Sequence, residues 1–190
     1  MNATERSTDR RATRTTLAVA ATLTLAVLLA VRMGLFVPSW ASFSTGSWTV
    51  DLDGDGLAES LELRERRLSV GSSRMEAYVT PSSWQVMDAV VCDVDGNGKQ
   101  ELAMLVWRRG NYGSSRPFWD TKPDLRMTEH LYLLCLRDGQ MEPFWMGHEL
   151  GREVTSLSFD PISGTVTLHE RNGTSSTWVW EGFGFVCTDE

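Results

Sequence analysis

The sequence of 190 residues has few of the residues that hold small secreted domains together. Its 3 cysteines are too few for a disulfide framework. Cys92 and Cys135 can pair outside the cell, which leaves Cys187 as an odd thiol, and buried reduced cysteines fit the sequence equally well. The 3 histidines lie far apart, without the spacing of a metal site. The sequence therefore excludes a disulfide-held scaffold.

Catalytic motifs and positive charge are also scarce. The chain has no G-x-S-x-G, H-E-x-x-H or P-loop motif, and no G-x-G-x-x-G motif between a strand and a helix. From residue 38 onward, 13 Lys and Arg face 23 Asp and Glu, a formal charge of −10. Such an acidic surface argues against nucleic-acid binding. We therefore predict neither a common type of enzyme site nor a nucleic-acid partner.

One long hydrophobic run lies near the N-terminus. Residues 17–31 carry no charge, and the apolar character continues past Arg32 to Val37. As a helix, residues 17–37 measure about 31 Å, enough to cross a bilayer core. Four arginines precede the run, and basic flanks stay in the cytoplasm. We therefore predict a cytoplasmic tail over 1–16, a transmembrane anchor over 17–37, and everything after it outside the membrane.

The same N-terminal region has a second interpretation. Ser39-Trp40-Ala41 has the small-x-small form of a cleavage site, so a signal peptide cleaved near Ala41 is the alternative to an anchor. Both interpretations export the remainder of the chain. Residues 38–46 are small and polar and predict a linker, which leaves 47–190 as one extracytoplasmic domain.

The hydrophobic pattern of this domain predicts β-structure. Short apolar runs such as Trp84–Cys92 and Glu101–Trp107 alternate with turn residues, as in antiparallel hairpins. Ser60–Val70 shows period-two leucines and valines, although a helix over Ala58–Leu68 is also compatible with its residues. A further strand is expected over Met75–Thr80. We therefore predict an all-β domain.

Two segments share the form D-x-D-G-[DN]-G-x-x-E and begin 42 residues apart. They are Asp51–Glu59 (DLDGDGLAE) and Asp93–Glu101 (DVDGNGKQE), called the first and second loop below. Oxygen-bearing side chains at positions 1, 3, 5 and 9 of a tight loop suit a hard cation, above all calcium. The glycines allow the backbone to fold round the ion. The sequence thus predicts one or two calcium ions.

These loops, with the apolar strand after the second, resemble the FG-GAP and VCBS-type repeats of integrin-like β-propellers. In that family the loop joins two strands of a blade and binds calcium. The implied ligands are the side chains of Asp51, Asp53, Asp55 and Glu59 with the carbonyl of Leu57, and those of Asp93, Asp95, Asn97 and Glu101 with the carbonyl of Lys99. Roughly 40–45 residues per blade make about three blades, fewer than a closed propeller needs. The resemblance therefore implies propeller-blade-like hairpins in an incomplete propeller, a repeat-derived sandwich or one part of an oligomer.

Two alternatives compete for the loops. Asp51, Asp53, Asp55 and Glu62 fit an EF-hand, whose twelfth position is a bidentate glutamate, but Met104 takes that place in the second loop. Asp-Gly and Asn-Gly also form hairpin turns without any metal. A metal-free turn is less consistent with the first loop, because its carboxylates would repel one another unless a cation screened them.

For function we predict a membrane-anchored, calcium-binding interaction module without enzymatic activity, whose ligand is a protein or a carbohydrate. The alternatives are a polysaccharide-active enzyme of the cell envelope and an accessory or sensor subunit, each with structural calcium.

Overall fold

The computed structural model describes residues 3–112, 118 and 123–189, with side chains from residue 16 onward. It divides into two compact units, Met1–Phe36 and Val37–Glu190. The first holds the helix α1 (Ala3–Arg32), and the described residues of the second form twelve strands. The strands are β1 (Gly46–Val50), β2 (Glu59–Arg64), β3 (Arg67–Gly71), β4 (Tyr78–Val79), β5 (Gln85–Cys92), β6 (Glu101–Arg109), β7 (Met127–Arg137), β8 (Gln140–Glu149), β9 (Val154–Asp160), β10 (Thr165–Glu170), β11 (Ser175–Trp180) and β12 (Phe185–Cys187).

The helix α1 begins well before the hydrophobic run. Its residues from Ala3 onward are helical, because extending a helix costs far less than nucleating one. The helix ends at Arg32, before the predicted end at Val37, and Gly34 follows with a φ of 69°. In the described part of the chain, no helix combines the length and the apolar character needed to span a membrane.

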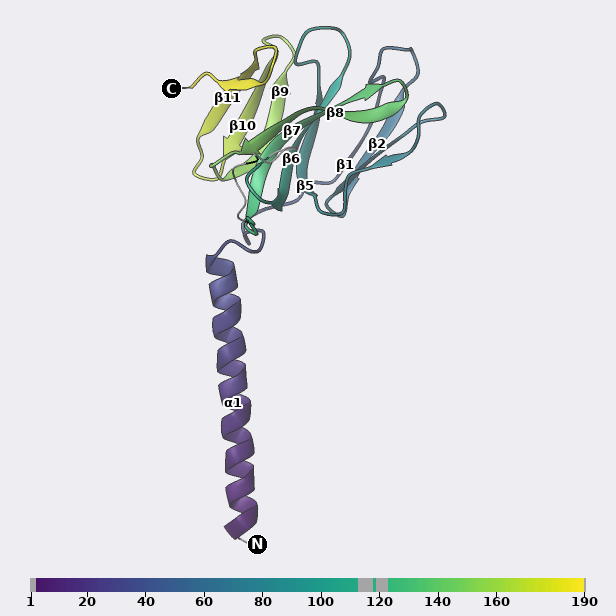
Figure 1. Ribbon diagram of the computed structural model, residues 1–190. Coiled ribbons are helices and arrows are strands. Elements are labelled where there is room, and N and C mark those ends of the chain that lie inside the picture. Colours follow the sequence, from purple (N-terminus) through teal and green to yellow (C-terminus); the bar gives the residue numbers. More distant parts are fainter. Residues whose placement is uncertain (1–2, 113–117, 119–122, 190) are drawn as a thin grey trace. The chain divides into compact units, whose positions relative to one another are not determined.

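The second unit confirms the all-β prediction. Its strands form three four-stranded antiparallel sheets, each built from four consecutive strands: sheet A (β1–β4), sheet B (β5–β8) and sheet C (β9–β12). Each sheet is a simple meander, in which every strand pairs with the next one along the chain. Sheet B lies between the other two, as Figure 1 shows for β5–β8 in relation to β1, β2 and β9–β11.

Strand β6 shows why sheet B is the middle layer. Its side chains alternate between two hydrophobic cores. Leu102, Met104 and Val106 face sheet A, whereas Ala103, Leu105 and Trp107 face sheet C. Successive side chains of a strand point to opposite faces, so a strand covered on both sides has a continuous apolar sequence. The uninterrupted run that follows the second loop is therefore the sequence of a middle layer.

The outward faces of sheets A and C are polar. On β2 the exposed positions are Ser60, Glu62 and Arg64. On β10, Thr165, Thr167 and His169 share the face opposite the buried Val166 and Leu168. A further sheet stacked on either face would bury hydroxyl and charged groups without assured partners. Both outward faces therefore suit contact with solvent.

The segment Ser60–Val70 is a hairpin and not one strand or a helix. β2 and β3 pair in register through Arg64 and Arg67, and the turn residues Glu65 and Arg66 have φ of 51° and 64°. Two residues at positive φ make the tight turn that fits the twist of a hairpin, usually with Asn or Gly. The sequence did not predict this turn, because both positions hold charged residues in place of Asn or Gly. β4 is also shorter than the strand expected over Met75–Thr80.

All three cysteines are free, so Cys92 and Cys135 form no disulfide. Both of these side chains are buried. Burial raises the pKa of the Cys92 thiol to about 12, although its hydrogen bond with the Ala103 backbone lowers it. A thiol in this setting stays protonated and packs as a small hydrophobic side chain.

Candidate metal-binding loops

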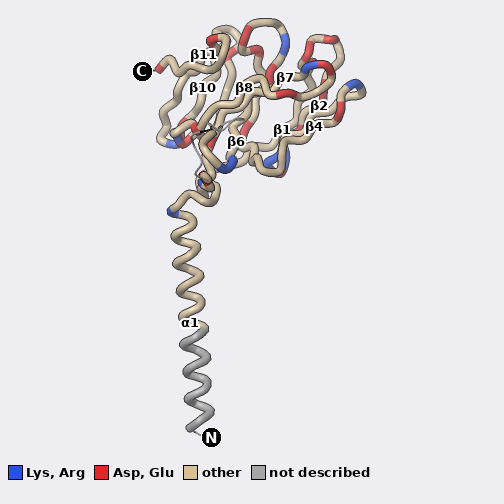
Figure 2. The backbone as a smooth tube through the Cα atoms, in the orientation of Figure 1, with Lys and Arg blue, Asp and Glu red and all other residues tan. Residues whose placement is uncertain are grey.

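The two loops close equivalent hairpins. The first joins β1 to β2, and the last strand pair before it is Val50 with Glu59. The second joins β5 to β6, and the corresponding pair is Cys92 with Glu101. Each loop therefore ends on a glutamate that is already the first residue of the returning strand. Asp and Glu residues are red in Figure 2, which shows them repeatedly at the loops of the β domain.

The glycines of the two loops have matching backbones. Gly54 and Gly56 have φ of 77° and 86°, and the equivalent Gly96 and Gly98 have φ of 70° and 85°. An added Cβ would meet no atom within 4 Å at any of the four, so conformation and not crowding requires glycine. The repeated sequence thus produces a repeated conformation.

The first aspartate of each loop gathers backbone N–H groups. Asp51 Oδ1 accepts from Gly54 at 2.7 Å, and Asp51 Oδ2 accepts from Gly56 at 2.8 Å. Asp93 Oδ1 accepts from Asn97 at 3.0 Å, and Asp93 Oδ2 accepts from Gly98 at 2.9 Å. These bonds fold the backbone around the carboxylate and fix its orientation.

The final glutamate of each loop closes its neck. Glu59 Oε2 accepts from the Leu52 N–H at 3.0 Å, and Glu101 Oε2 accepts from the Val94 N–H at 3.1 Å. The glutamates are only 3% and 2% exposed, respectively. A buried carboxylate is costly unless hydrogen bonds and charge partners compensate it. The positions of these glutamates therefore indicate a partner for their charge.

Each loop brings three carboxylates together. One oxygen from each of Asp51, Asp53 and Glu59 lies within 4.8 Å of the others, and Asp93, Asp95 and Glu101 form the same arrangement. Oxygens that bind one calcium ion at 2.3–2.6 Å can be at most about 5 Å apart. Both groups meet this limit, so each can hold a metal ion.

The residue at the fifth position of each loop makes contacts other than those of the three carboxylates. Asp55 lies outside the three-carboxylate group: its Oδ1 accepts from the Leu57 N–H at 2.8 Å, and its Oδ2 is 3.5 Å from Arg74 Nη1. Asn97 donates from Nδ2 to Asp95 Oδ2 at 2.8 Å and accepts at Oδ1 from the Lys99 N–H at 2.7 Å. The sequence did not indicate the Arg74 contact, because 19 residues separate it from Asp55.

Burial raises the pKa of the Glu101 carboxyl to about 7. The Val94 hydrogen bond lowers this pKa, and the charges of Asp95 and then Asp93 raise it. A cation beside the carboxylates would reverse the effect of these charges, because it favours the ionised forms.

The EF-hand alternative does not fit the geometry. Strands and not helices flank both loops. Glu62, the required twelfth ligand, lies three positions after the buried Glu59 and points to the exposed outer face of β2. Alternation along the strand separates the two side chains, so Glu62 cannot join the group that contains Glu59.

The structure shows a buried polar cluster around His130 that the sequence did not predict. The sequence shows only a single histidine within an apolar strand. His130 Nδ1 lies 3.0 Å from the Gly147 carbonyl oxygen, and Nε2 lies 3.0 Å from that of Gly110. Thr128 Oγ1 is 2.9 Å from Nε2 and donates to the Gly110 carbonyl at 2.7 Å. Burial lowers the pKa of His130, and the two carbonyls oppose that change. The ring thereby links β7 to the strand β8 and to the segment after β6.

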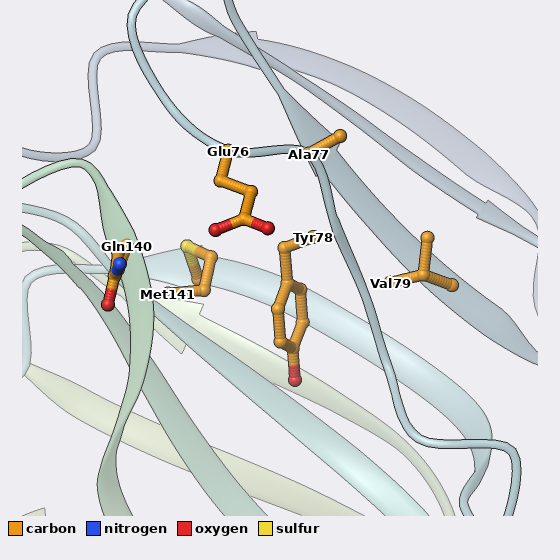
Figure 3. A pocket seen from close by; sticks show the side chains of 6 residues that line it. All are labelled: Glu76, Ala77, Tyr78, Val79, Gln140 and Met141. Carbon is orange, nitrogen blue, oxygen red and sulfur yellow. The ribbon is translucent and has the colours of Figure 1, made fainter.

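A hollow of about 300 Å³ lies between β4 and the start of β8. Figure 3 shows the Glu76 carboxylate turned toward Met141, with the Tyr78 ring alongside. Beside it, the Glu76 N–H donates to the Gly139 carbonyl at 3.3 Å. Gly139 has a φ of 76°, and an added Cβ would lie 3.3 Å from the Arg74 carbonyl oxygen. The positive φ, together with this close approach of two backbones, favours glycine at position 139.

Comparison of the chain with protein-family models, with curated proteins and with solved structures found no match. The functional interpretation therefore depends on the residues and their geometry.

Proposed function

We propose that residues 47–190 form a calcium-stabilised interaction module, and that its two loops are FG-GAP or VCBS-type calcium sites. The observation that carries this proposal is the repetition of one geometry. In both loops the first and third residues and a buried glutamate converge, while glycines at positive φ close the turn. An inert hairpin turn has no need of three converging carboxylates.

The proposed ligand sets extend the two carboxylate groups. In the first loop, Asp55 and the carbonyl of Leu57 join Asp51, Asp53 and Glu59. In the second, Asn97 and the carbonyl of Lys99 join Asp93, Asp95 and Glu101. Calcium accepts six to eight oxygen ligands with flexible geometry, which suits a mixed set of carboxylate, amide and carbonyl oxygens. Bound calcium would screen the repulsion among the carboxylates and so stabilise the fold.

The three sheets support the proposed relation to propeller blades. Each is a four-stranded meander, and a loop of the repeated form joins the first two strands of both sheet A and sheet B. In sheet C the corresponding turn keeps only the Asp160 cap, which accepts from Ser163 Oγ at 2.7 Å. We therefore propose three blade-like units, of which two carry calcium loops.

The proposal also includes a compartment. Calcium sites of extracellular modules have dissociation constants of about 10⁻⁴–10⁻³ M, which only extracytoplasmic calcium levels fill. We place the module on that side of the membrane, with no enzymatic activity of its own. Protease treatment of intact cells tests this placement: a fully protected β domain would contradict it.

Calcium titration of the full chain tests the central claim. We expect isothermal titration calorimetry to detect calcium binding, and thermal unfolding to shift upward with calcium and downward with EGTA. Magnesium at the same concentration should have a smaller effect, because it demands stricter octahedral geometry. A melting temperature that changes with neither calcium nor EGTA would refute the calcium role.

A further inference from the structure

A groove runs beside the second loop. Its volume is about 590 Å³, and it separates that loop in sheet B from the turn between β9 and β10 in sheet C. Asp93 and Asp95 line one side. Phe159, Ile162 and Trp180 belong to the other side. The groove therefore combines an acidic wall with an apolar wall.

Two large apolar side chains are exposed at this end of sheet C. Ile162, in the turn between β9 and β10, is 95% exposed, and Phe183, between β11 and β12, is 97% exposed. Both turns lie at one end of the sheet, because Thr165 pairs with Asp160 on one side and with Val179 on the other. Ile162 lines the groove, and Phe183 lies in the turn that follows the lining residue Trp180. Exposed large apolar groups beside a concave surface are typical of interaction sites.

The charged residues that line the groove have one sign. Its lining residues include no Lys, Arg or His. Asp160 and Glu181 begin the two turns that carry the exposed apolar side chains. With Lys99 included, the second loop carries a net charge of −2, which a calcium ion would offset, so Asp160 and Glu181 keep the region negative. This surface attracts a cationic ligand and repels anionic lipid or nucleic acid.

We propose that this groove docks an extended peptide segment of a partner protein, in which basic side chains alternate with large apolar ones. The apolar side chains would cover Ile162 and Phe183, and the basic ones would face Asp160 and Glu181, because calcium would occupy Asp93 and Asp95. The proposal deepens the interaction module proposed above and rests on it in one respect, because calcium would order the loop that forms one wall of the groove.

A synthetic peptide serves as the probe. We would titrate the full chain, in 1 mM CaCl₂, against fluorescein-labelled Gly-Phe-Arg-Leu-Lys-Val-Gly and follow fluorescence anisotropy. Two matched peptides replace either the basic residues by Glu or the apolar residues by Ser. We expect saturable binding of the first peptide only, weakened at least about threefold in 0.5 M NaCl through screening.

Two substitutions locate the binding surface. Ile162→Ser and Phe183→Ser remove side chains that touch little of the fold, so both variants should keep the wild-type circular dichroism and melting temperature. Each should weaken the affinity for the peptide at least about fivefold, which is the loss expected when a well-covered apolar anchor is truncated. Val79→Ser is the control, because Val79 is an exposed apolar residue of sheet A outside this groove.

The remaining outcomes separate this proposal from the calcium role. Absence of peptide binding, or equal binding by both Ser variants and wild type, would overturn the proposal that the groove docks a peptide. Adsorption to phosphatidylcholine vesicles that requires Ile162 and Phe183, without peptide binding, would assign the surface to a membrane instead. Calorimetry measures calcium binding independently of the peptide. Calcium binding without peptide binding refutes only the docking proposal. Peptide binding that is sensitive to the variants, without calcium binding, refutes only the calcium role.

Discussion

Glu101 Oε2 accepts a hydrogen bond from the Val94 backbone N–H at 3.1 Å, and this bond joins the two ends of the second loop. The carboxylate that closes the neck therefore also belongs to the group that can hold a metal ion. Because one side chain serves both purposes, loop closure and metal binding should be separable by a substitution that keeps the acceptor and removes the charge.

Glu101→Gln is that substitution. Its amide oxygen can still accept from Val94, so we expect the fold to persist while calcium affinity of the second loop falls at least about tenfold. Calorimetry and calcium-dependent melting measure the two effects. The control is Glu62→Gln, which alters the EF-hand position on the exposed face of β2 and should leave calcium binding unchanged. Equal losses in both variants would contradict the proposed ligand set.

Gly98→Ala should destabilise the domain by about 1–2 kcal/mol, because it places an alanine in the left-handed region. Gly98 has a φ of 85° and nothing within 4 Å of an added Cβ. Gly71 has equally open space without a positive φ, which makes Gly71→Ala a matched control for backbone strain. Urea unfolding of both variants gives the comparison. Similar losses at the two positions would show that the loop conformation imposes no special demand.

Glu129 should make stability depend on pH. Burial raises the pKa of this carboxyl to about 8 from an ordinary 4.5, against a hydrogen bond from Val154, while the charge of Glu153 adds to the rise. The folded state therefore holds a proton that the unfolded state releases above pH 4.5, and the associated stability is lost as pH rises toward 8.

Glu129→Gln isolates this effect. The difference in unfolding free energy between wild type and variant should change by on the order of 3 kcal/mol between pH 5 and pH 8, in favour of the variant at the higher pH. Urea midpoints at several pH values measure it. Parallel pH profiles for wild type and Glu129→Gln would mean that this carboxyl does not retain its proton.

His130→Leu should cost about 2–4 kcal/mol, because it deprives the buried Gly147 carbonyl oxygen of its ring partner and removes the ring contact with the Gly110 carbonyl oxygen. His169→Leu provides the control. That histidine is exposed on the outer face of β10, and we expect a change within about 0.5 kcal/mol. Thermal unfolding of the two variants tests the difference, and an equally mild effect at His130 would exclude a structural role for its cluster.

Local patterns in the sequence predicted much of the β domain. The two loops, the strands on either side of the second loop and the all-β class follow from short-range chemistry: acidic residues, glycines and period-two apolar residues. The turn at Glu65 and Arg66 did not follow, because charged residues adopt the left-handed conformation there only with the support of the paired strands. The helical start of α1 did not follow either, because its polar residues extend the helix that comes after them.

The sequence by itself determined the acidic, glycine-rich composition of the loops and the alternation of the strands, because both depend on residues close together along the chain. Only the tertiary structure decided that β6 is covered on both faces, that Arg74 lies beside Asp55, and that the turn carrying Ile162 faces the second loop across a groove. These relationships join residues from different strands or different sheets. Their positions follow from how three sheets stack to bury two cores, which no single segment encodes.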